Sequence, residues 1–141
     1  MKRYFTIVGI SAATCTLAAP PPQMQEGLWE ITTQTEIADT TAPLPPETTR
    51  ACYSKQDVEN DSAATPKDEK CEIQDYRVAG NIASWNIVCS APEKITGNGT
   101  VTFHNRTSYS GTAALRMQIQ GKPPIQMTNR YSGKRLGECL P

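Results

Sequence analysis

Cysteines are the residues whose type and spacing carry the clearest chemistry in this chain of 141 residues. Cys52, Cys71, Cys89 and Cys139 lie in its body, and a fifth cysteine, Cys15, lies near its start. A zinc site requires closely spaced pairs of the C-x-x-C kind, and these spacings are far longer. An even number of cysteines in a short exported chain is typical of a disulfide framework, so we expect two disulfides.

The segment from Cys71 to Cys89 predicts how the cysteines pair. It has the composition of two strands joined by a turn at Gly80. Cys71 and Cys89 are equally distant from Gly80, and residues equidistant from the turn of an antiparallel hairpin face one another close to disulfide distance. We therefore predict a bond between Cys71 and Cys89, which leaves Cys52 to pair with Cys139.

His104 is the single histidine of the chain. In the alternating pattern of its strand it lies on the face opposite Val101 and Phe103, so we expect it to point outward. A catalytic histidine needs a nucleophile and an orienting acid, and a metal-binding one needs further ligands at suitable spacing; the sequence places neither beside it. The glycines at 97–99 and 133 precede no helix of a β-α-β unit, which favours turns over a phosphate loop. We expect no catalytic residue, metal or cofactor.

Arg130, Lys134 and Arg135 form a basic cluster near the end of the chain. One interpretation is an anion site or a contact with a lipid headgroup. The other is packing on Trp29, because arginine stems cover apolar surface and guanidinium groups lie flat on indole faces. Arg130 is even-numbered and Tyr131 is odd-numbered, so Arg130 points to the face opposite the apolar one. Arg135 is therefore the better candidate to pack on Trp29. A Gly-x-Trp that opens the first strand, with an arginine near the last, resembles the lock of the lipocalin-like calycin barrels.

Antiparallel strands are the elements that must position these residues. Apolar and polar residues alternate with period two over 27–37, 109–119 and 125–131, which predicts strands with one apolar face. A shift of the apolar phase from Cys71 and Ile73 to Tyr76 and Val78 predicts a bulge or a half-exposed strand, and residues 54–57 resemble a capped helix start. We predict an all-β domain in which a single antiparallel meander of about six or seven strands curls into a barrel or half-barrel, with one short helical turn.

The start of the chain is typical of a targeting segment. Lys2 and Arg3 precede a charge-free stretch and then small residues suited to cleavage. We predict a signal peptide over 1–19 and a single disulfide-bonded β domain over 20–141, located in the periplasm or secreted. The alternative is a lipid on Cys15 that would tether the protein to the membrane, although the residues before Cys15 fit a lipoprotein signal poorly.

Composition limits the classes of partner. The chain has 14 basic and 14 acidic residues, and loss of the leader leaves 12 basic and 14 acidic ones, so we expect no nucleic-acid partner. Apolar residues make up 38% and the mean hydropathy is −0.48, which is low for a packed enzyme and ordinary for a thin β fold with one wet face.

Several motifs resemble those of a bacterial family of unknown function, number 3617, whose members are small exported proteins chiefly of proteobacteria. The resemblance runs from about residue 27 to 139, and its most specific part is the closing run 130–139. It implies a periplasmic address but brings no activity and no functional residues. The other motifs that carry it are residues 27–32, Cys71…Gly80-Asn81…Trp85…Cys89, and 109–111.

Six large apolar residues share the predicted apolar face and are candidates to contact a ligand. Methionine adapts to irregular ligands, but such residues also simply fill cores. We expect a non-enzymatic protein that binds a small or lipid-like ligand; the alternative is an envelope interaction or structural protein acting through a sheet edge or the basic C-terminal end. The six candidates are Trp29, Trp85, Phe103, Leu115, Met117 and Met127.

Overall fold

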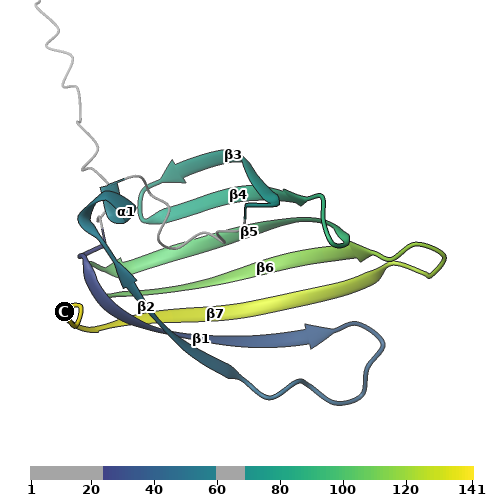
Figure 1. The fold of residues 1–141 in the computed structure, drawn as a ribbon, viewed down its shortest axis with the longest axis horizontal. Coiled ribbons are helices and arrows are strands. Elements are labelled where there is room, and N and C mark those ends of the chain that lie inside the picture. Colours follow the sequence, from purple (N-terminus) through teal and green to yellow (C-terminus); the bar gives the residue numbers. More distant parts are fainter. Residues whose placement is uncertain (1–23, 60–68) are drawn as a thin grey trace, which may run out of the picture.

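A computed structural model describes residues 24–59 and 69–141. The described residues form seven antiparallel strands in one sheet and one short helix (Figure 1). The predicted leader over 1–19 and Cys15 lie outside them. The elements are β1 (Gly27–Ile37), β2 (Glu47–Tyr53), α1 (Lys55–Glu59), β3 (Cys71–Ala79), β4 (Ile82–Cys89), β5 (Lys94–Asn105), β6 (Ser108–Gln118) and β7 (Ile125–Gly137).

The strand order is β2-β1-β7-β6-β5-β4-β3, so a five-strand meander from β3 to β7 is extended by β1 and then β2. The sheet curls strongly (Figure 1) but is not closed into a barrel, because β2 and β3 remain as its two edges. The all-β prediction is confirmed. The first and last strands, β1 and β7, are hydrogen-bonded neighbours as expected, although no closed barrel brings them together.

Both predicted disulfides are present. Cys71 and Cys89 face one another in the register of β3 and β4, with Cα atoms 3.9 Å apart. Cys52 on β2 bonds Cys139, which follows β7, with Cα atoms 5.6 Å apart. The predicted bulge also occurs: the register of β3 shifts between Gln74 and Arg77.

The short helix α1 begins with the expected capping arrangement. The Asp57 amide donates to the Ser54 hydroxyl at 3.2 Å, and the Ser54 amide donates to the Asp57 carboxylate at 2.9 Å. Val58 is the buried residue of this helix and packs in the same cluster as Trp29. The helix therefore covers part of the sheet near the start of β1.

The prediction that the glycines at 97–99 and 133 mark turns is wrong. Gly97 and Gly99 lie inside β5, and Gly133 lies inside β7. Aromatic rings lie against two of them: a Cβ on Gly99 would come closer than 3.0 Å to the Trp85 ring, and one on Gly133 to the Tyr109 ring. Glycine inside a strand can mark such a close approach, and here it makes room for a ring from the adjacent strand.

Candidate functional site

The two faces of the sheet differ in burial and polarity. In β1 and β4 to β7 the strand registers pair odd-numbered residues with odd-numbered residues over most of their length, and the buried positions are odd-numbered. We call this the inner face and the opposite one the outer face. The structure places all six candidate residues on the inner face: Trp29, Trp85, Phe103, Leu115, Met117 and Met127.

Aromatic side chains fill one end of the inner face. Trp29 is 0% exposed and stacks on Tyr109 with ring centroids 5.5 Å apart, and Tyr109 contacts Phe103 edge-on at 6.3 Å. β7 lies between the strands of Trp29 and Tyr109, and the Tyr109 ring reaches Trp29 by lying across Gly133 of β7. Tyr53 from β2 also packs on Trp29, with ring centroids 6.4 Å apart, and it lies near Tyr109 as well. Trp29 and Phe103, two of the six candidates for ligand contact, therefore pack against other side chains of the protein at this end.

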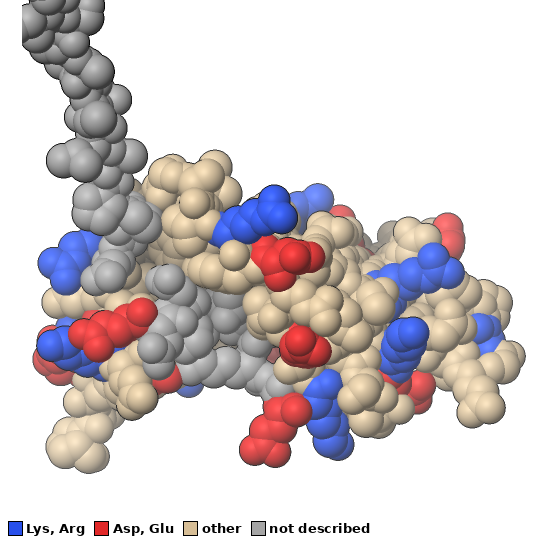
Figure 2. Space-filling view, turned by 90° about the horizontal axis from the view of Figure 1, so that it is seen from above, with Lys and Arg blue, Asp and Glu red and all other residues tan. Residues whose placement is uncertain are grey.

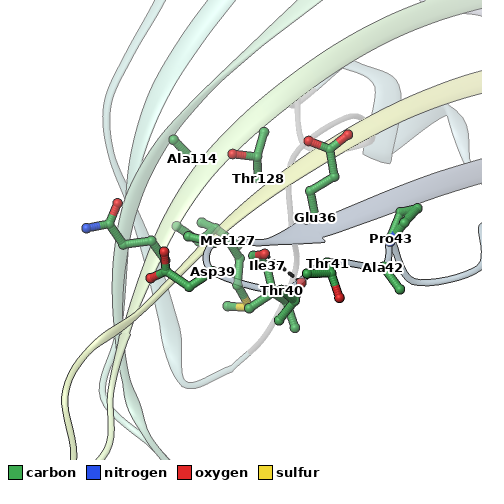
Figure 3. A pocket seen from close by; sticks show the side chains of 13 residues that line it. Glu36, Ile37, Asp39, Thr40, Thr41, Ala42, Pro43, Ala114, Met127 and Thr128 are labelled. Atoms are coloured by element: carbon green, nitrogen blue, oxygen red, sulfur yellow. Dashed lines mark hydrogen bonds between the residues drawn. The ribbon is translucent and has the colours of Figure 1, made fainter.

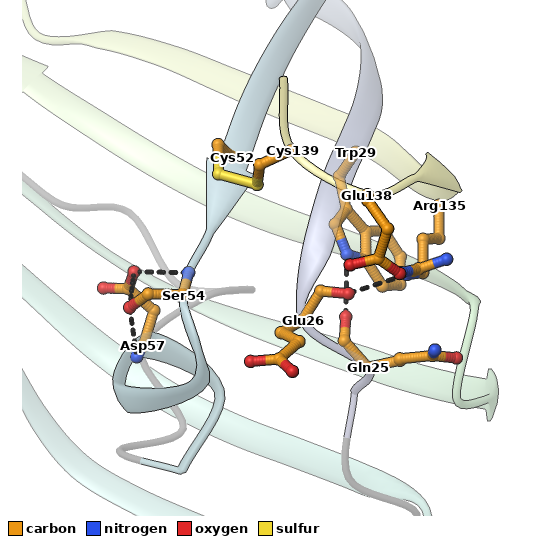
Figure 4. The surroundings of a disulfide bond; sticks show 9 residues. All are labelled: Gln25, Glu26, Trp29, Cys52, Ser54, Asp57, Arg135, Glu138 and Cys139. Atoms are coloured by element: carbon orange, nitrogen blue, oxygen red, sulfur yellow. Dashed lines mark hydrogen bonds and ion pairs between the residues drawn. A yellow bond between two sulfur atoms is a disulfide. The ribbon is translucent and has the colours of Figure 1, made fainter. Parts of the chain in front are cut away.

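The Trp29 end is also held by hydrogen bonds to the chain that enters β1 (Figure 4). The Trp29 indole donates to the Gln25 carbonyl at 3.0 Å. Arg135 lies opposite Trp29 in register, and its Nε donates to the Glu26 carbonyl at 2.7 Å while its guanidinium pairs with Glu138. The Arg135 side chain is only 12% exposed, so this arginine is part of the framework around Trp29.

The other two cations of the basic cluster are exposed on the outer face. Arg130 lies on the face opposite Trp29, where it pairs with Glu36 of β1, and Lys134 lies beside Glu30 in register. From above, acidic and basic side chains are interspersed (Figure 2). The cluster predicted from sequence is therefore divided between two faces, and its cations do not form one site.

A single row of paired residues crosses the middle of the inner face. Trp85 of β4 is followed across the sheet by Gly99, Ala113, Asn129 and Thr35. Trp85 is 2% exposed, and its ring lies against Gly99. The buried Trp85 Nε1 and Asn129 Oδ1 have no hydrogen-bond partner among the residues that the structure describes.

Beyond this row, the inner face stays apolar: Ile87 and Cys89 of β4 are still only 4% exposed, but the residues of the other strands are only partly buried. Three of the six candidates lie here, on the ends of β6 and β7, and isoleucines from neighbouring strands surround them. Burial therefore decreases along β6 and β7, from the closed aromatic end to this open end. The half-buried residues are Ile37, Ile95, Leu115, Met117, Ile125 and Met127.

A hollow of about 570 Å³ lies at the edge of this end, under the loop that joins β1 to β2, and residues of both faces of the sheet line it (Figure 3). Glu36, Ala114 and Thr128 point to one side of the ribbon, and Ile37 and Met127 point to the other (Figure 3). Leu115 and Met127, two of the candidate residues, are part of its lining. Because carboxylates, hydroxyls and aliphatic groups meet there, the hollow suits an amphipathic molecule rather than a purely apolar one.

Buried tyrosines add hydroxyls to the inner face without adding charge. Burial raises the pKa of Tyr131 to about 12, with the Trp85 indole acting in the opposite direction. Burial, and next the neighbouring Tyr53, raise the pKa of Tyr109 as well. The Tyr131 hydroxyl donates to the Thr100 carbonyl at 3.2 Å. Both phenols are therefore neutral at physiological pH.

The family model described as "Protein of unknown function (DUF3617)" matches residues 24–139. The chain belongs to the DUF3617 family. The resemblance found in the sequence motifs is thereby confirmed over nearly the same range. No curated protein and no solved structure is significantly similar to the chain. Because the family description carries no activity, the function of this DUF3617 protein has to be argued from its own residues.

His104 is exposed, as predicted, but it has a neighbour that the sequence did not place. The register of β5 and β6 shifts between Phe103 and Asn105, and the His104 Nε2 lies 2.7 Å from the Ser110 hydroxyl. His104, Ser110 and Lys134 line a second hollow of about 570 Å³, which lies on the outer face. A catalytic triad consists of a serine, a histidine and an acid that orients the histidine, and Ser110 and His104 have the distance of its first two members. Of the carboxylates in the described ranges, none hydrogen-bonds the histidine ring, so this DUF3617 chain shows no orienting acid.

No group of three or more His, Cys, Asp or Glu side chains in 24–59 and 69–141 is arranged to hold a metal ion. No helix within these ranges is long and apolar enough to cross a membrane.

Proposed function

We propose that this DUF3617 protein is exported and binds a small amphipathic or lipid-like ligand on the inner face of its sheet, without catalysing a reaction. The observation that carries the proposal is the decrease in burial along β6 and β7 on that face. Tyr109 and Ala113 of β6 are 3% and 5% exposed, whereas Leu115, Met117 and Met127 farther along are only partly buried. A pocket with apolar walls and a few polar groups is typical of small-molecule sites, and volumes of about 300–1,000 Å³ are usual.

Export is supported by the two disulfides and by the charged, then apolar, start of the chain. We expect the mature protein to begin at Ala19 or Pro20. Sequencing the N-terminus of protein from the periplasm tests this. A chain that begins at a lipid-modified Cys15 would contradict cleavage at that place and would make the protein a membrane-tethered binder.

The alternative, a protein partner at a sheet edge or at the basic end, has less support. The β3 edge is interrupted by its bulge at Asp75, which has a φ of 51°, and bulges of this kind obstruct pairing with another strand. Of the basic cluster, Arg130 and Arg135 are already paired with Glu36 and Glu138. An occupant of the half-exposed inner face therefore remains the better-supported function.

Titration with the neutral fluorescent probe N-phenyl-1-naphthylamine tests ligand binding. We expect its emission to rise on binding to the wild type and to be lost in Met127→Glu, which places a charge among the half-buried apolar residues. Thr112→Glu is the matched control, because Thr112 is exposed on the outer face of β6. Binding that is absent in the wild type, or equal in the two variants, would contradict the proposal. Native mass spectrometry of periplasmic protein then separates a bound small molecule from a bound protein partner.

A further inference from the structure

Two buried polar atoms on the inner face have no hydrogen-bond partner among the described residues. Trp85 is 2% exposed, and its Nε1 donor has no acceptor; the Asn129 Oδ1 acceptor is buried without a donor, both within the described residues. Trp29 provides the contrast, because its indole N–H is bonded to the Gln25 carbonyl. Buried polar groups in native proteins are nearly always paired, and an exception calls for an explanation.

The two atoms belong to residues in the same row of the sheet. Trp85 and Asn129 are separated only by Gly99 and Ala113, which have the smallest side chains available. The Trp85 ring lies across Gly99 and therefore extends from β4 toward β7. A donor and an acceptor thus belong to one row of the inner face, and Tyr131 and Leu115 pack against the cluster that Trp85 and Ala113 form there.

The neighbouring groups on this face do not satisfy them. The Tyr131 hydroxyl lies close enough to the Trp85 indole for the indole to lower its pKa, and it donates to the Thr100 carbonyl, but no hydrogen bond of normal geometry joins it to the Trp85 N–H. In the other direction along β7, the next residue on the inner face is Met127, at the half-buried apolar end. The row that contains Trp85 and Asn129 is therefore a polar site between the packed aromatic end and the open apolar end.

We propose that Trp85 Nε1 and Asn129 Oδ1 anchor the head group of a neutral amphiphile whose apolar chain lies along Leu115, Met117 and Met127. A hydroxyl or amide head accepts a hydrogen bond from the indole and donates one to the Asn129 carbonyl, so it satisfies both atoms. The inference rests on the proposed function and adds the chemical class of the ligand.

The charges on the inner face favour a neutral head group. Among the described inner-face residues of β1 and β4 to β7, Arg135 is the charged one, and it lies at the Trp29 end, where Glu26 and Glu138 engage it. A carboxylate at Asn129 would lose hydration without gaining a cation, and an ammonium group would lack an acid. Charged amphiphiles of the same chain length should bind more weakly.

Competition experiments test the head-group preference. Decanol, decanoate and decyltrimethylammonium are titrated against bound N-phenyl-1-naphthylamine in the wild type, in Asn129→Leu and in the outer-face control Thr112→Leu. We expect decanol to compete best with the wild type, and Asn129→Leu to weaken decanol about five-fold relative to the dye. Thr112→Leu should behave as the wild type.

The indole signals provide a direct readout. The chain has two tryptophans, so its nitrogen–proton NMR spectrum has two indole signals, which Trp85→Phe assigns. We expect decanol to shift the Trp85 signal downfield as its N–H gains an acceptor, and to leave the already bonded Trp29 signal in place.

The outcomes separate this inference from the proposed function. If the dye binds but the three amphiphiles compete equally, or if Asn129→Leu leaves decanol unaffected, the anchor is wrong while the ligand-binding function stands. A Trp85 signal that does not move during displacement also overturns the anchor alone, and it points to a bound water as the partner of these atoms. A wild-type protein that binds no dye overturns the function and the anchor together.

Discussion

The indole of Trp85 on β4 lies directly against Gly99 on β5, where any side chain would overlap the ring. Two further cross-strand pairs repeat the arrangement: Tyr109 lies against Gly133, and Tyr131 against Gly111. Each ring can lie flat on the sheet because the glycine opposite it presents no Cβ. The inner face therefore holds large aromatic rings within a narrow space.

We expect Gly99→Ala and Gly133→Ala each to lower the free energy of unfolding by about 1–3 kcal/mol, because the added methyl must displace a buried ring. Urea denaturation measures this. Thr112→Ala on the outer face is the control and should change stability by less than about 0.5 kcal/mol. If Gly99→Ala proved as stable as the control, the Trp85 ring would not lie on β5.

These glycines show a limit of sequence-based prediction. The alternation of residue types predicts most strands, and the equal distances of Cys71 and Cys89 from Gly80 predict both register and disulfide. Both signals are local, because a hairpin pairs residues that are close in sequence. The prediction fails at Gly99 and Gly133 because a glycine in the sequence does not reveal whether the chain bends there or a ring lies on it.

The relationship between Trp29 and Arg135 gives a second prediction. Trp29→Ala should cost about 3–5 kcal/mol through lost core volume, and Arg135→Ala about 1 kcal/mol. Because both side chains hold consecutive carbonyls, those of Gln25 and Glu26, the double variant should lose less than the sum. Denaturant unfolding of the four proteins measures the coupling.

Two variants sharpen that cycle. Arg135→Lys keeps the charge but lacks the Nε that donates to Glu26, so it should resemble Arg135→Ala. Arg130→Ala removes an exposed ion pair with Glu36 and should cost no more than about 1 kcal/mol, without coupling to Trp29. Strict additivity of the Trp29 and Arg135 changes would show that the two residues act independently.

The candidate site was predictable only in part. The period of two placed all six apolar candidates on one face, because parity follows from strand geometry. It did not show that Trp29 and Phe103 contact Tyr109, since that depends on the Tyr109 ring lying across Gly133 of the neighbouring strand. It also missed Ser110 beside His104, because a bulge between Phe103 and Asn105 sets that contact.

The two disulfides should contribute unequally to stability. They close loops with sequence separations of 87 residues for Cys52–Cys139 and 18 for Cys71–Cys89. In the chain-entropy model, replacing both cysteines of a pair by serine costs about 4–5 kcal/mol for the long loop and about 3 kcal/mol for the short one. Urea unfolding of the two double variants tests the order. A larger loss for the Cys71–Cys89 pair would mean that native-state contacts, rather than loop length, decide.

Alkaline pH should destabilise the protein through its buried phenols. The pKa of Tyr131 rises from 10 in the unfolded chain to about 12 in the fold, and that of Tyr109 shifts in the same direction. A group whose pKa is raised by folding contributes its full stabilisation at pH values below its unfolded pKa. This contribution is lost as the pH rises through the folded pKa. For Tyr131 alone this amounts to about 2–3 kcal/mol, lost between pH 10 and 12.

Denaturant unfolding at a series of pH values, followed with tyrosinate absorbance, measures this loss. Tyr131→Phe should be less stable than the wild type at neutral pH, because its bond to the Thr100 carbonyl is gone, yet its stability should fall less steeply above pH 10. The two curves should therefore converge as the pH rises. Parallel curves, or folded tyrosines that all ionise near pH 10, would show that the Tyr131 hydroxyl is solvated and that the middle of the inner face is open to water.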